Sequence, residues 1–303
     1  MQKFMTETTE KKQTTLTQKQ DMLEIRKFTK DSAPLIHCIT NPISIHDCAN
    51  IILAAGARPI MAEHPDEVEE ITAEAAALML NLGNITDARI ASMQRALKAA
   101  SQRNIPVLLD LVGVTCSRLR RDFARSLLSS RQISIIKGNI SEILAAAELP
   151  FHGTGIDAGI QDAVSEGNEA WYCETARQLA SYFQCTVMAT GKQDLIANAT
   201  EAFLVSNGHT ALSGITGTGC MVGALTAAYL PGSRAIMQRS GSENNRNGSE
   251  TTAALLGAIT MGLAGERAAA VSRGPGSFQA ALLDEIYCLT DEQLLSGARV
   301  RMA

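Results

Sequence analysis

The sequence predicts an α/β protein with three α/β/α layers, a mostly parallel central sheet and no separate lid domain. Two observations carry this prediction. Short apolar runs rich in β-branched residues or leucine alternate along the chain with amphipathic helical stretches. The runs are apolar throughout rather than alternating with polar residues, which is typical of strands covered on both faces. Aromatic residues make up only 4% of the chain, so aliphatic side chains and alanine must fill most of the core.

The expected elements follow from these runs. Five runs are predicted to form strands of the sheet: Leu35–Ile39, Ala77–Leu82, Val107–Leu111, Ile133–Ile136 and Thr186–Ala189. The amphipathic stretches are predicted to form helices: Ile45–Ala55, Ile85–Arg103, Asp122–Ser130, Ile140–Ala147 and Glu169–Phe183. A turn and short strand is expected within Gly56–Ala62. Further short segments lie near Leu195–Ala197 and Ala202–Val205, and a long helical region starts at Gly219.

The domain organisation is simple. Residues 1–20 are polar and have almost no large apolar side chains, so they are expected to form a disordered tail. Residues 21–303 are expected to form a single domain with a helix from Asp21. A polar run, Ser240–Ser249, predicts a flexible loop at about residues 233–250.

Composition excludes several classes of protein. The net charge of −4 gives no reason to expect a nucleic-acid partner. Seven cysteines without a C-x-x-C pair predict neither a disulfide framework nor a zinc site. We expect no leader peptide, because residues 1–20 contain no apolar run, and no apolar stretch is judged long enough to cross a bilayer. We therefore expect no membrane partner and a cytoplasmic location. Neither a P-loop nor a G-x-G-x-x-G dinucleotide fingerprint is present, so any ATP site must be of another kind.

The sharpest chemical signal is the segment Gly217-Thr218-Gly219-Cys220, which precedes an apolar helical run. Its glycines let the backbone approach a ligand, and the following helix directs unpaired N–H groups and its positive dipole end there. We interpret Gly217, Thr218 and Gly219 as an anion hole for a phosphoryl group. Cys220 is expected to have a lowered thiol pKa at this helix terminus. The alternatives are a turn that only caps the helix and a cysteine that only packs beneath it.

Polar side chains also gather where predicted strands end. Lys137, Asn139 and Glu142 follow one strand, where lysine and carboxylate could hold nucleotide phosphates and a hydrated Mg²⁺. A capping box formed by Asn139 and Glu142 would explain those two residues equally well. Asp110 ends another strand and could act on a metal, or simply form a turn.

Three weaker candidates lie near the same edge. Thr190 ends a further strand and could touch a nucleotide, although an ordinary hairpin explains it. Asn41 could hydrogen-bond a substrate heteroatom or cap a helix. Met61 could be an apolar pocket wall or part of the core.

Taken together and in this order, the motifs resemble the hydroxyethylthiazole kinase family, whose members have a ribokinase-like fold. The matching segments cover roughly Pro34 to Leu289: Ile39–Asn41, Gly56–Met61, Asn81–Gly83, Asp110–Val114, Lys137–Glu142, Thr190–Gly191 and Thr216–Cys220. Their joint occurrence is much more specific than any one of them.

The resemblance implies ATP-dependent phosphorylation of 4-methyl-5-(2-hydroxyethyl)thiazole to its monophosphate, for thiamine biosynthesis or salvage. It implies roles for individual residues: Met61 and Gly217 at the thiazole, Lys137 and Thr190 at ATP, Asp110 and Glu142 at Mg²⁺, and Cys220 beside the substrate hydroxyl. Most ribokinase-like enzymes carry aspartate where this chain has Cys220. The family also commonly has arginine at position 137. A homotrimer with active sites between subunits is likewise implied.

Two alternatives remain at this point. One is another ribokinase-like kinase, acting on a pyrimidine or pyridoxal-type alcohol. The other is a non-catalytic nucleotide- or metabolite-binding protein, because a fold does not fix a function. Asp110, Glu142 and Cys220 argue against a mere binder, which needs no carboxylates to organise a metal.

Overall fold

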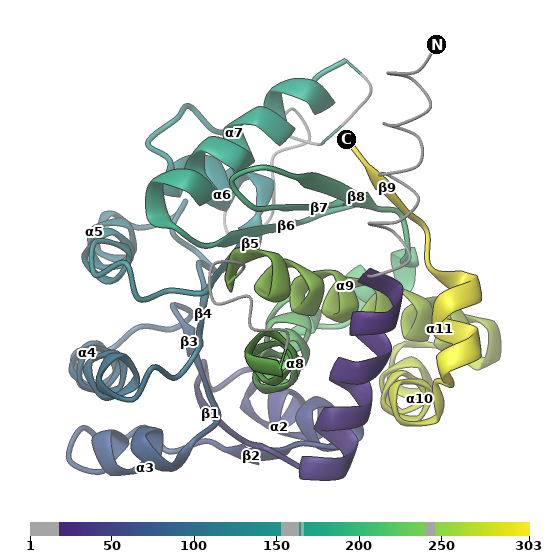
Figure 1. Ribbon diagram of the computed structural model, residues 1–303, viewed down its shortest axis with the longest axis horizontal. Helices are drawn as coiled ribbons and strands as arrows, with labels where there is room; N and C mark the ends of the chain where they lie inside the picture. The colour runs from purple at the N-terminus through teal and green to yellow at the C-terminus, as the bar shows by residue number, and fades with distance from the viewer. Residues whose placement is uncertain (1–17, 153–163, 165–166, 240–245) are drawn as a thin grey trace.

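A computed structural model describes residues 18–152, 164, 167–239 and 246–303. These residues form one nine-stranded sheet with helices on both faces (Figure 1). The strands are β1 (Leu35–Ile39), β2 (Arg58–Ile60), β3 (Ala77–Asn81), β4 (Val107–Asp110), β5 (Ile135–Asn139), β6 (Thr186–Thr190), β7 (Asp194–Ala197), β8 (Ala202–Val205) and β9 (Val300–Met302).

The sheet is parallel over its larger part, as the sequence predicts. The strand order is β2-β1-β3-β4-β5-β6-β7-β8-β9. Every pairing from β2 through β6 is parallel. The pairings from β6 to β9 are antiparallel. The carboxyl ends of β3, β4, β5 and β6 therefore meet at one edge of the sheet.

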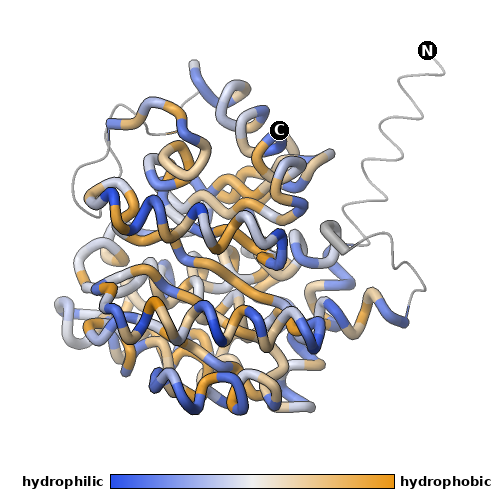
Figure 2. The backbone as a smooth tube through the Cα atoms, turned by 90° about the vertical axis from the view of Figure 1, so that its left-hand side faces the viewer, coloured by the Kyte–Doolittle hydropathy of each residue, from blue (hydrophilic) through white to orange (hydrophobic). Residues whose placement is uncertain are grey.

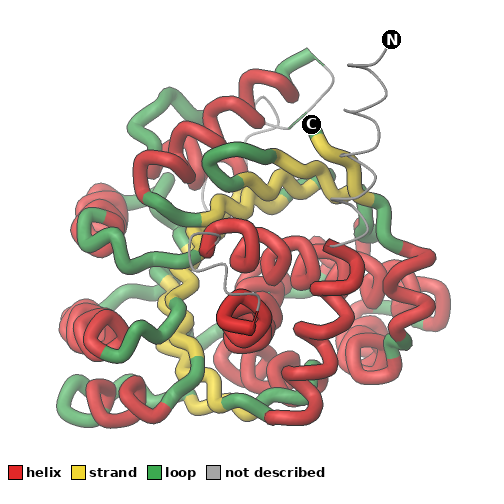
Figure 3. The backbone as a smooth tube through the Cα atoms, in the orientation of Figure 1, coloured by secondary structure: helices red, strands yellow, loops and turns green. Residues whose placement is uncertain are grey.

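Helices cover the two faces of the sheet in separate layers (Figures 1 and 3). One layer contains α3 (Val68–Glu74), α4 (Asp87–Gln102), α5 (Arg118–Leu128), α6 (Ile140–Ala146) and α7 (Glu169–Phe183). The other contains a helix over residues 18–32, α2 (Ile45–Ala54), α8 (Thr218–Arg239), α9 (Arg246–Val271), α10 (Pro275–Cys288) and α11 (Asp291–Gly297). The predicted three-layer α/β/α architecture is confirmed.

The strands contribute side chains to two apolar cores, one on each face of the sheet. In β3, Met79 belongs to the core beneath α8 and α9, while Leu78 and Leu80 belong to the core beneath α4 and α5. Successive side chains of a strand point to opposite faces, so a strand between two helical layers must be apolar throughout. The helices α3, α4 and α5, which face the viewer in Figure 2, instead alternate hydrophilic and hydrophobic residues, as expected for helices that bury one side.

Helix α9 corrects one expectation. The segment Gly248–Val271 is long and apolar enough, by length and composition alone, to cross a membrane, so the expectation that no such stretch exists is wrong. In the structure 72% of its most apolar window is buried, and it packs against α8, α10 and the sheet. It therefore lies in the structure as a core helix.

Several boundaries also differ from the predictions. Residues 18–20 are helical rather than part of a tail, and residues 1–17 lie outside the described residues. The loop expected at about 233–250 is wrong over most of its length, because 233–239 belong to α8 and 246–250 to α9; residues 240–245 lie outside the described residues. Helix α3 and strand β9 were not predicted. Strand β5 extends to Asn139, so Lys137 lies on the strand and not after it.

The contact between α8 and α9 depends on a glycine. A Cβ added to Gly257 would lie 2.1 Å from Thr226 Oγ1 and 3.0 Å from Thr226 Cβ, both on buried α8. We expect Gly257→Ala to force these helices apart and to lower the free energy of unfolding by about 1–3 kcal/mol. Urea unfolding of wild type and variant measures the difference.

Gly276 provides the matched control. A Cβ on Gly276, in the exposed first turn of α10, would meet nothing within 4 Å. Gly276→Ala is expected to leave stability unchanged or to raise it by about 0.4–1 kcal/mol. Equal unfolding free energies for the two variants would contradict the close approach of α8 and α9.

Candidate active site

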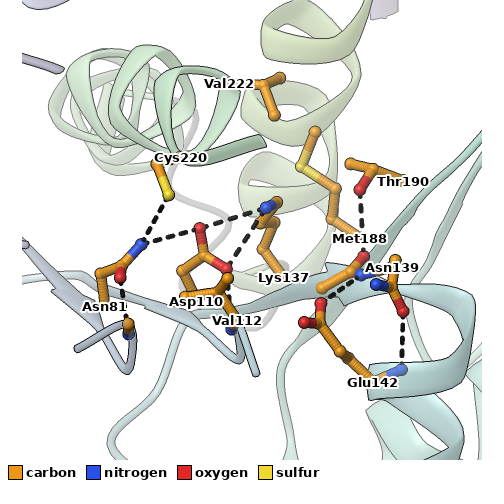
Figure 4. A network of polar contacts seen from close by, with 12 residues as sticks. Asn81, Asp110, Val112, Lys137, Asn139, Glu142, Met188, Thr190, Cys220 and Val222 are labelled. Carbon is orange, nitrogen blue, oxygen red and sulfur yellow. Dashed lines mark hydrogen bonds and ion pairs between the residues drawn. The ribbon is translucent and has the colours of Figure 1, made fainter. Parts of the chain in front are cut away.

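The site begins as a row of polar side chains across three adjacent strands. The parallel register aligns Asn81 of β3 with Asp110 of β4, and Asp110 with Lys137 of β5. Each of these residues is 4% exposed or less. Figure 4 shows their side chains pointing toward one another beneath the start of α8.

Asp110 and Lys137 form a buried ion pair. Lys137 Nζ lies 3.1 Å from Asp110 Oδ2 and 3.3 Å from Oδ1. Asn81 Nδ2 donates to Oδ2 at 3.2 Å and the Val112 N–H donates to Oδ1 at 3.2 Å. Burial raises the pKa of Asp110, and the lysine opposes this effect; the field of Asp110 helps to raise the pKa of Lys137 against its own burial. The structure thus holds a cation and a carboxylate together at the sheet edge.

Cys220 lies in the first turn of α8, above this pair. Its Sγ accepts hydrogen bonds from Asn41 Nδ2 and Asn81 Nδ2, both at 3.2 Å. The expectation of a lowered thiol pKa is wrong: burial, followed by the negative charge of Asp110, raises the pKa of Cys220. Burial and the carboxylate outweigh the opposing effect of Lys137, so Cys220 is a neutral thiol at neutral pH.

Glu142 is the far carboxylate of the site and forms the predicted capping box at the start of α6. Its Oε2 accepts from the Asn139 N–H at 2.7 Å, and Asn139 Oδ1 accepts from the Glu142 N–H at 2.9 Å. The other oxygen, Oε1, accepts at 2.7 Å from the N–H of Gly113, in the loop after β4. Burial raises the pKa of Glu142, and Asp110 adds to this effect while Lys137 opposes it.

The donor set agrees with a hydrated magnesium ion. Among the described residues, no group of three or more His, Cys, Asp or Glu side chains could enclose a metal. Mg²⁺ does not need such a cage, because it keeps several waters and uses one or two carboxylates together with phosphate oxygens. Asp110 and Glu142 are two buried carboxylates that interact electrostatically, and a cation between them would offset the burial that raises both pKa values.

The weaker candidates are placed around this centre. Thr190 lies beside Asn139 on the neighbouring strand and donates from Oγ1 to the Gly138 carbonyl at 3.3 Å. Gly217 precedes α8 with φ +85°, and a Cβ there would lie 3.1 Å from Ser44 Cβ. Asn41 fixes the loop before α2 by accepting at Oδ1 from the N–H groups of Ile43 and Ser44, both at 3.1 Å. The hydrogen-bond network therefore includes Asn41 but reaches Thr190 only through β5.

Met61 stands apart from the hydrogen-bond network. It follows β2, is half-buried and packs against the apolar cluster to which Cys220 also belongs. Asn81 was given no role from the sequence, although its side chain is hydrogen-bonded to those of Asn41, Asp110 and Cys220. Its signal was available, since Asn81 ends a strand at the same edge as Asp110.

The model of the hydroxyethylthiazole kinase family matches residues 25–292. The chain belongs to this family. A Clostridium botulinum (strain Langeland) protein of the family, hydroxyethylthiazole kinase 2, is 43% identical over 278 residues, covering 92% of this chain and 99% of its own.

Solved structures agree with this assignment. The hydroxyethylthiazole kinase protein of Pyrococcus horikoshii OT3 is 32% identical, with a TM-score of 0.77, and the match covers 93% of this chain and 98% of that one. A ribokinase-like superfamily protein from Enterococcus faecalis V583 matches over 83% of this chain and 86% of its own with a TM-score of 0.51 and 12% identity, which supports the fold alone. The predicted family and ribokinase-like fold are confirmed, and the chain is a kinase that uses ATP.

A buried histidine holds the segment that carries Met61. His37, on β1, is fully buried; its Nε2 lies 2.9 Å from the Ala62 carbonyl and its Nδ1 lies 2.8 Å from Thr72 Oγ1. The carbonyl can only accept, so Nε2 carries the hydrogen and Nδ1 accepts from the threonine hydroxyl. Burial lowers the pKa of His37. The fold therefore favours the neutral imidazole.

We expect this preference to make stability depend on pH. Because the pKa of His37 is lower in the folded chain than its unfolded value of about 6.5, stability falls as pH falls through that value, by at most about 1.4 kcal/mol per pH unit. Relative to wild type, His37→Gln is expected to be less stable at neutral pH and to lose less stability on acidification. Urea unfolding between about pH 7.5 and 5 tests this, with exposed His209→Gln as control. Parallel curves for wild type and His37→Gln would contradict it.

Proposed function

We propose that this kinase transfers the γ-phosphoryl group of ATP to the hydroxyl of 4-methyl-5-(2-hydroxyethyl)thiazole, giving the monophosphate used in thiamine biosynthesis and salvage. The observation that carries the proposal is the placement of Cys220, in the first turn of α8, directly above the buried Asp110–Lys137 pair. A thiol for the alcohol and a lysine for phosphate are thereby brought to one place. The names of the relatives support the same acceptor.

Each part of the site has a task in this reaction. Phosphoryl transfer through a loose transition state requires mainly alignment and charge neutralisation. The N–H groups at Gly217, Thr218 and Gly219 face the transferring group, as the first N–H groups of a helix have no partner within it. Lys137 neutralises phosphate charge, and Thr190 contacts the nucleotide.

Cys220 acts mainly by position. Because its pKa is raised, the neutral thiol orients the substrate hydroxyl rather than removing its proton beforehand. A loose transition state has little bonding to the nucleophile, so early deprotonation of the alcohol contributes little. Asn41 and Met61 border the thiazole together with Gly217.

Asp110 and Glu142 would hold Mg²⁺, which supplies charge neutralisation for the phosphates when bound. The two carboxylates would do so through water molecules bound to the ion, as is usual for Mg²⁺. Their fixed hydrogen bonds to Val112, Asn139 and Gly113 keep them in place while the nucleotide enters.

We also infer a single domain, a cytoplasmic location and a homotrimer with active sites between subunits. The trimer is supported by large apolar side chains that are exposed just before α2 and on it. Ile43 is 59% exposed only two residues from Asn41, and Leu53 is 53% exposed on the helix that follows. A neighbouring subunit covering them would also close the thiazole side of the site.

The choice of alcohol is tested by turnover. Purified protein with Mg-ATP is expected to consume ATP with the thiazole alcohol, and much more slowly with pyridoxal or a hydroxymethyl-pyrimidine. Cysteine in place of the aspartate that other ribokinase-like kinases carry favours the thiazole alcohol. Faster turnover of either other alcohol would overturn the assignment of the acceptor, and absence of any alcohol-dependent ATP consumption would overturn the kinase proposal.

The role of Cys220 is tested separately. Cys220→Ala is expected to lower kcat by about 10²-fold, because the hydroxyl loses its positioning partner, with little change in the KM for ATP. Equal activity in this variant would remove Cys220 from the mechanism.

The pH dependence distinguishes positioning from base catalysis. With a positioning thiol, wild-type kcat is expected to stay level between about pH 7 and 8.5. A thiolate base with a raised pKa would make kcat rise about tenfold per pH unit over that range, and the rise would disappear in Cys220→Ser. A rise of that kind would show that Cys220 acts as a base.

A further inference from the structure

Arg120 is a cation at the edge of the site that no role above uses. It lies in the first turn of α5, and its guanidinium covers Gly113. Arg120 Nη1 is 1.9 Å, and Cζ is 3.1 Å, from the point where a Cβ on Gly113 would stand. The N–H of the same Gly113 binds Glu142 Oε1. The guanidinium therefore lies against the loop that fixes one of the two carboxylates.

The loop is shaped to admit this side chain. Gly113 has φ +79°, a conformation that residues with a side chain rarely adopt, and a Cβ there would displace the Arg120 guanidinium from its present position. Glycine thus lets the guanidinium lie directly on the backbone beside Glu142.

Within the described residues, the half-buried Arg120 makes no hydrogen bond and no ion pair. Its two neighbouring arginines differ from it in this respect. Arg121 Nη1 donates to the carbonyls of Val114 and Thr115 at 3.1 and 3.2 Å, which makes it part of the loop structure. Arg118 is 89% exposed and pairs with Asp122 at 3.5 Å. Arg120 is the arginine of this cluster that keeps all its donors for a ligand.

The charge of the site indicates what that ligand is. Asp110 and Glu142 are two buried carboxylates, whereas the hydrogen-bonded network contains a single cationic side chain, Lys137, which is already bonded to Asp110. A nucleoside triphosphate adds several negative charges beside them. An arginine fork binds phosphate with two parallel hydrogen bonds, which the point charge of a lysine does not provide.

We propose that Arg120 binds the phosphate end of the nucleotide beside Glu142, supplying the bidentate contact that Lys137 lacks. This inference rests on the proposed kinase function and adds a phosphate-binding residue to it. The alternative is that Arg120 only packs on the Gly113 loop and stabilises its conformation. The two roles predict different effects of removing the guanidinium. A phosphate-binding role predicts weaker binding only of ligands that carry phosphates, whereas a structural role predicts no such selectivity.

Binding of ADP and of adenosine to the intact protein separates these roles. Arg120→Gln is expected to weaken ADP binding, and to raise the KM for ATP, by about tenfold or more, since it removes charge-assisted hydrogen bonds. Adenosine affinity is expected to be unchanged, because adenosine has no phosphate. Arg120→Lys, which keeps the charge but not the fork, is expected to lie between Arg120→Gln and wild type. Arg118→Gln, the matched control, is expected to bind ADP as wild type does.

Calorimetric titration with ADP and adenosine, with and without Mg²⁺, gives these values, and thermal unfolding confirms that each variant is folded. Equal ADP affinity in Arg120→Gln and Arg118→Gln would overturn the proposal. So would an equal loss of adenosine and ADP affinity, which indicates a structural role. If Arg120→Gln does not fold, Arg120→Lys provides the test through its affinities for ADP and adenosine. A ratio of these two affinities equal to that of the wild type would then overturn the proposal. A wild-type protein that binds ADP without phosphorylating the thiazole alcohol would overturn the proposed function and leave the Arg120 comparison valid.

Discussion

The buried pair of Asp110 and Lys137 is the constraint from which the rest of the site follows. The two side chains are 0% and 5% exposed, and removing such ions from water costs several kcal/mol for each. That cost is offset only if the charges remain together and their other hydrogen-bonding positions are filled. The parallel register places the two residues side by side on β4 and β5, and Asn81 and Val112 bond the carboxylate oxygens. The register of the strands therefore brings these polar side chains together at one edge of the sheet.

Helix α8 must approach this pair closely, and glycine permits it. A Cβ on Gly223 would lie 3.0 Å from Met79 Cε and 3.4 Å from Asp110 Oδ2. Residues three apart lie on the same side of a helix, so the position that brings Gly223 against β3 and β4 also turns Cys220 toward the strand ends. There Asn41 and Asn81 bond its sulfur. The same orientation of α8 therefore allows its close packing on the sheet and places the Cys220 thiol in the site.

The sequence predicted the location of the site better than its electrostatics. Strand ends in a parallel sheet share an edge, which was enough to place Asp110 and Lys137 together from their positions alone. The lowered pKa assigned to Cys220 failed because burial is a property of the assembled fold, and a helix terminus considered alone does not reveal it. The short strand β9 pairs with β8 at the edge of the sheet, and its residues Val300–Met302 are exposed. It therefore has no apolar run from which it could have been predicted. The contact of Arg120 with Gly113 likewise depends on how a loop folds back onto α5.

The two interpretations of Glu142, as helix cap and as metal-organising carboxylate, are compatible in the structure. The capping box uses Oε2 and the N–H of Asn139, while Oε1 binds Gly113 in a different loop. These bonds tie the start of α6 to the segment after β4, so they fix the carboxylate relative to Asp110. A carboxylate oxygen that accepts one N–H hydrogen bond keeps another lone pair, which is free to accept from a water bound to a cation. The cap is thus the device that holds the carboxylate rigid, and rigidity is what a site that acts by alignment requires.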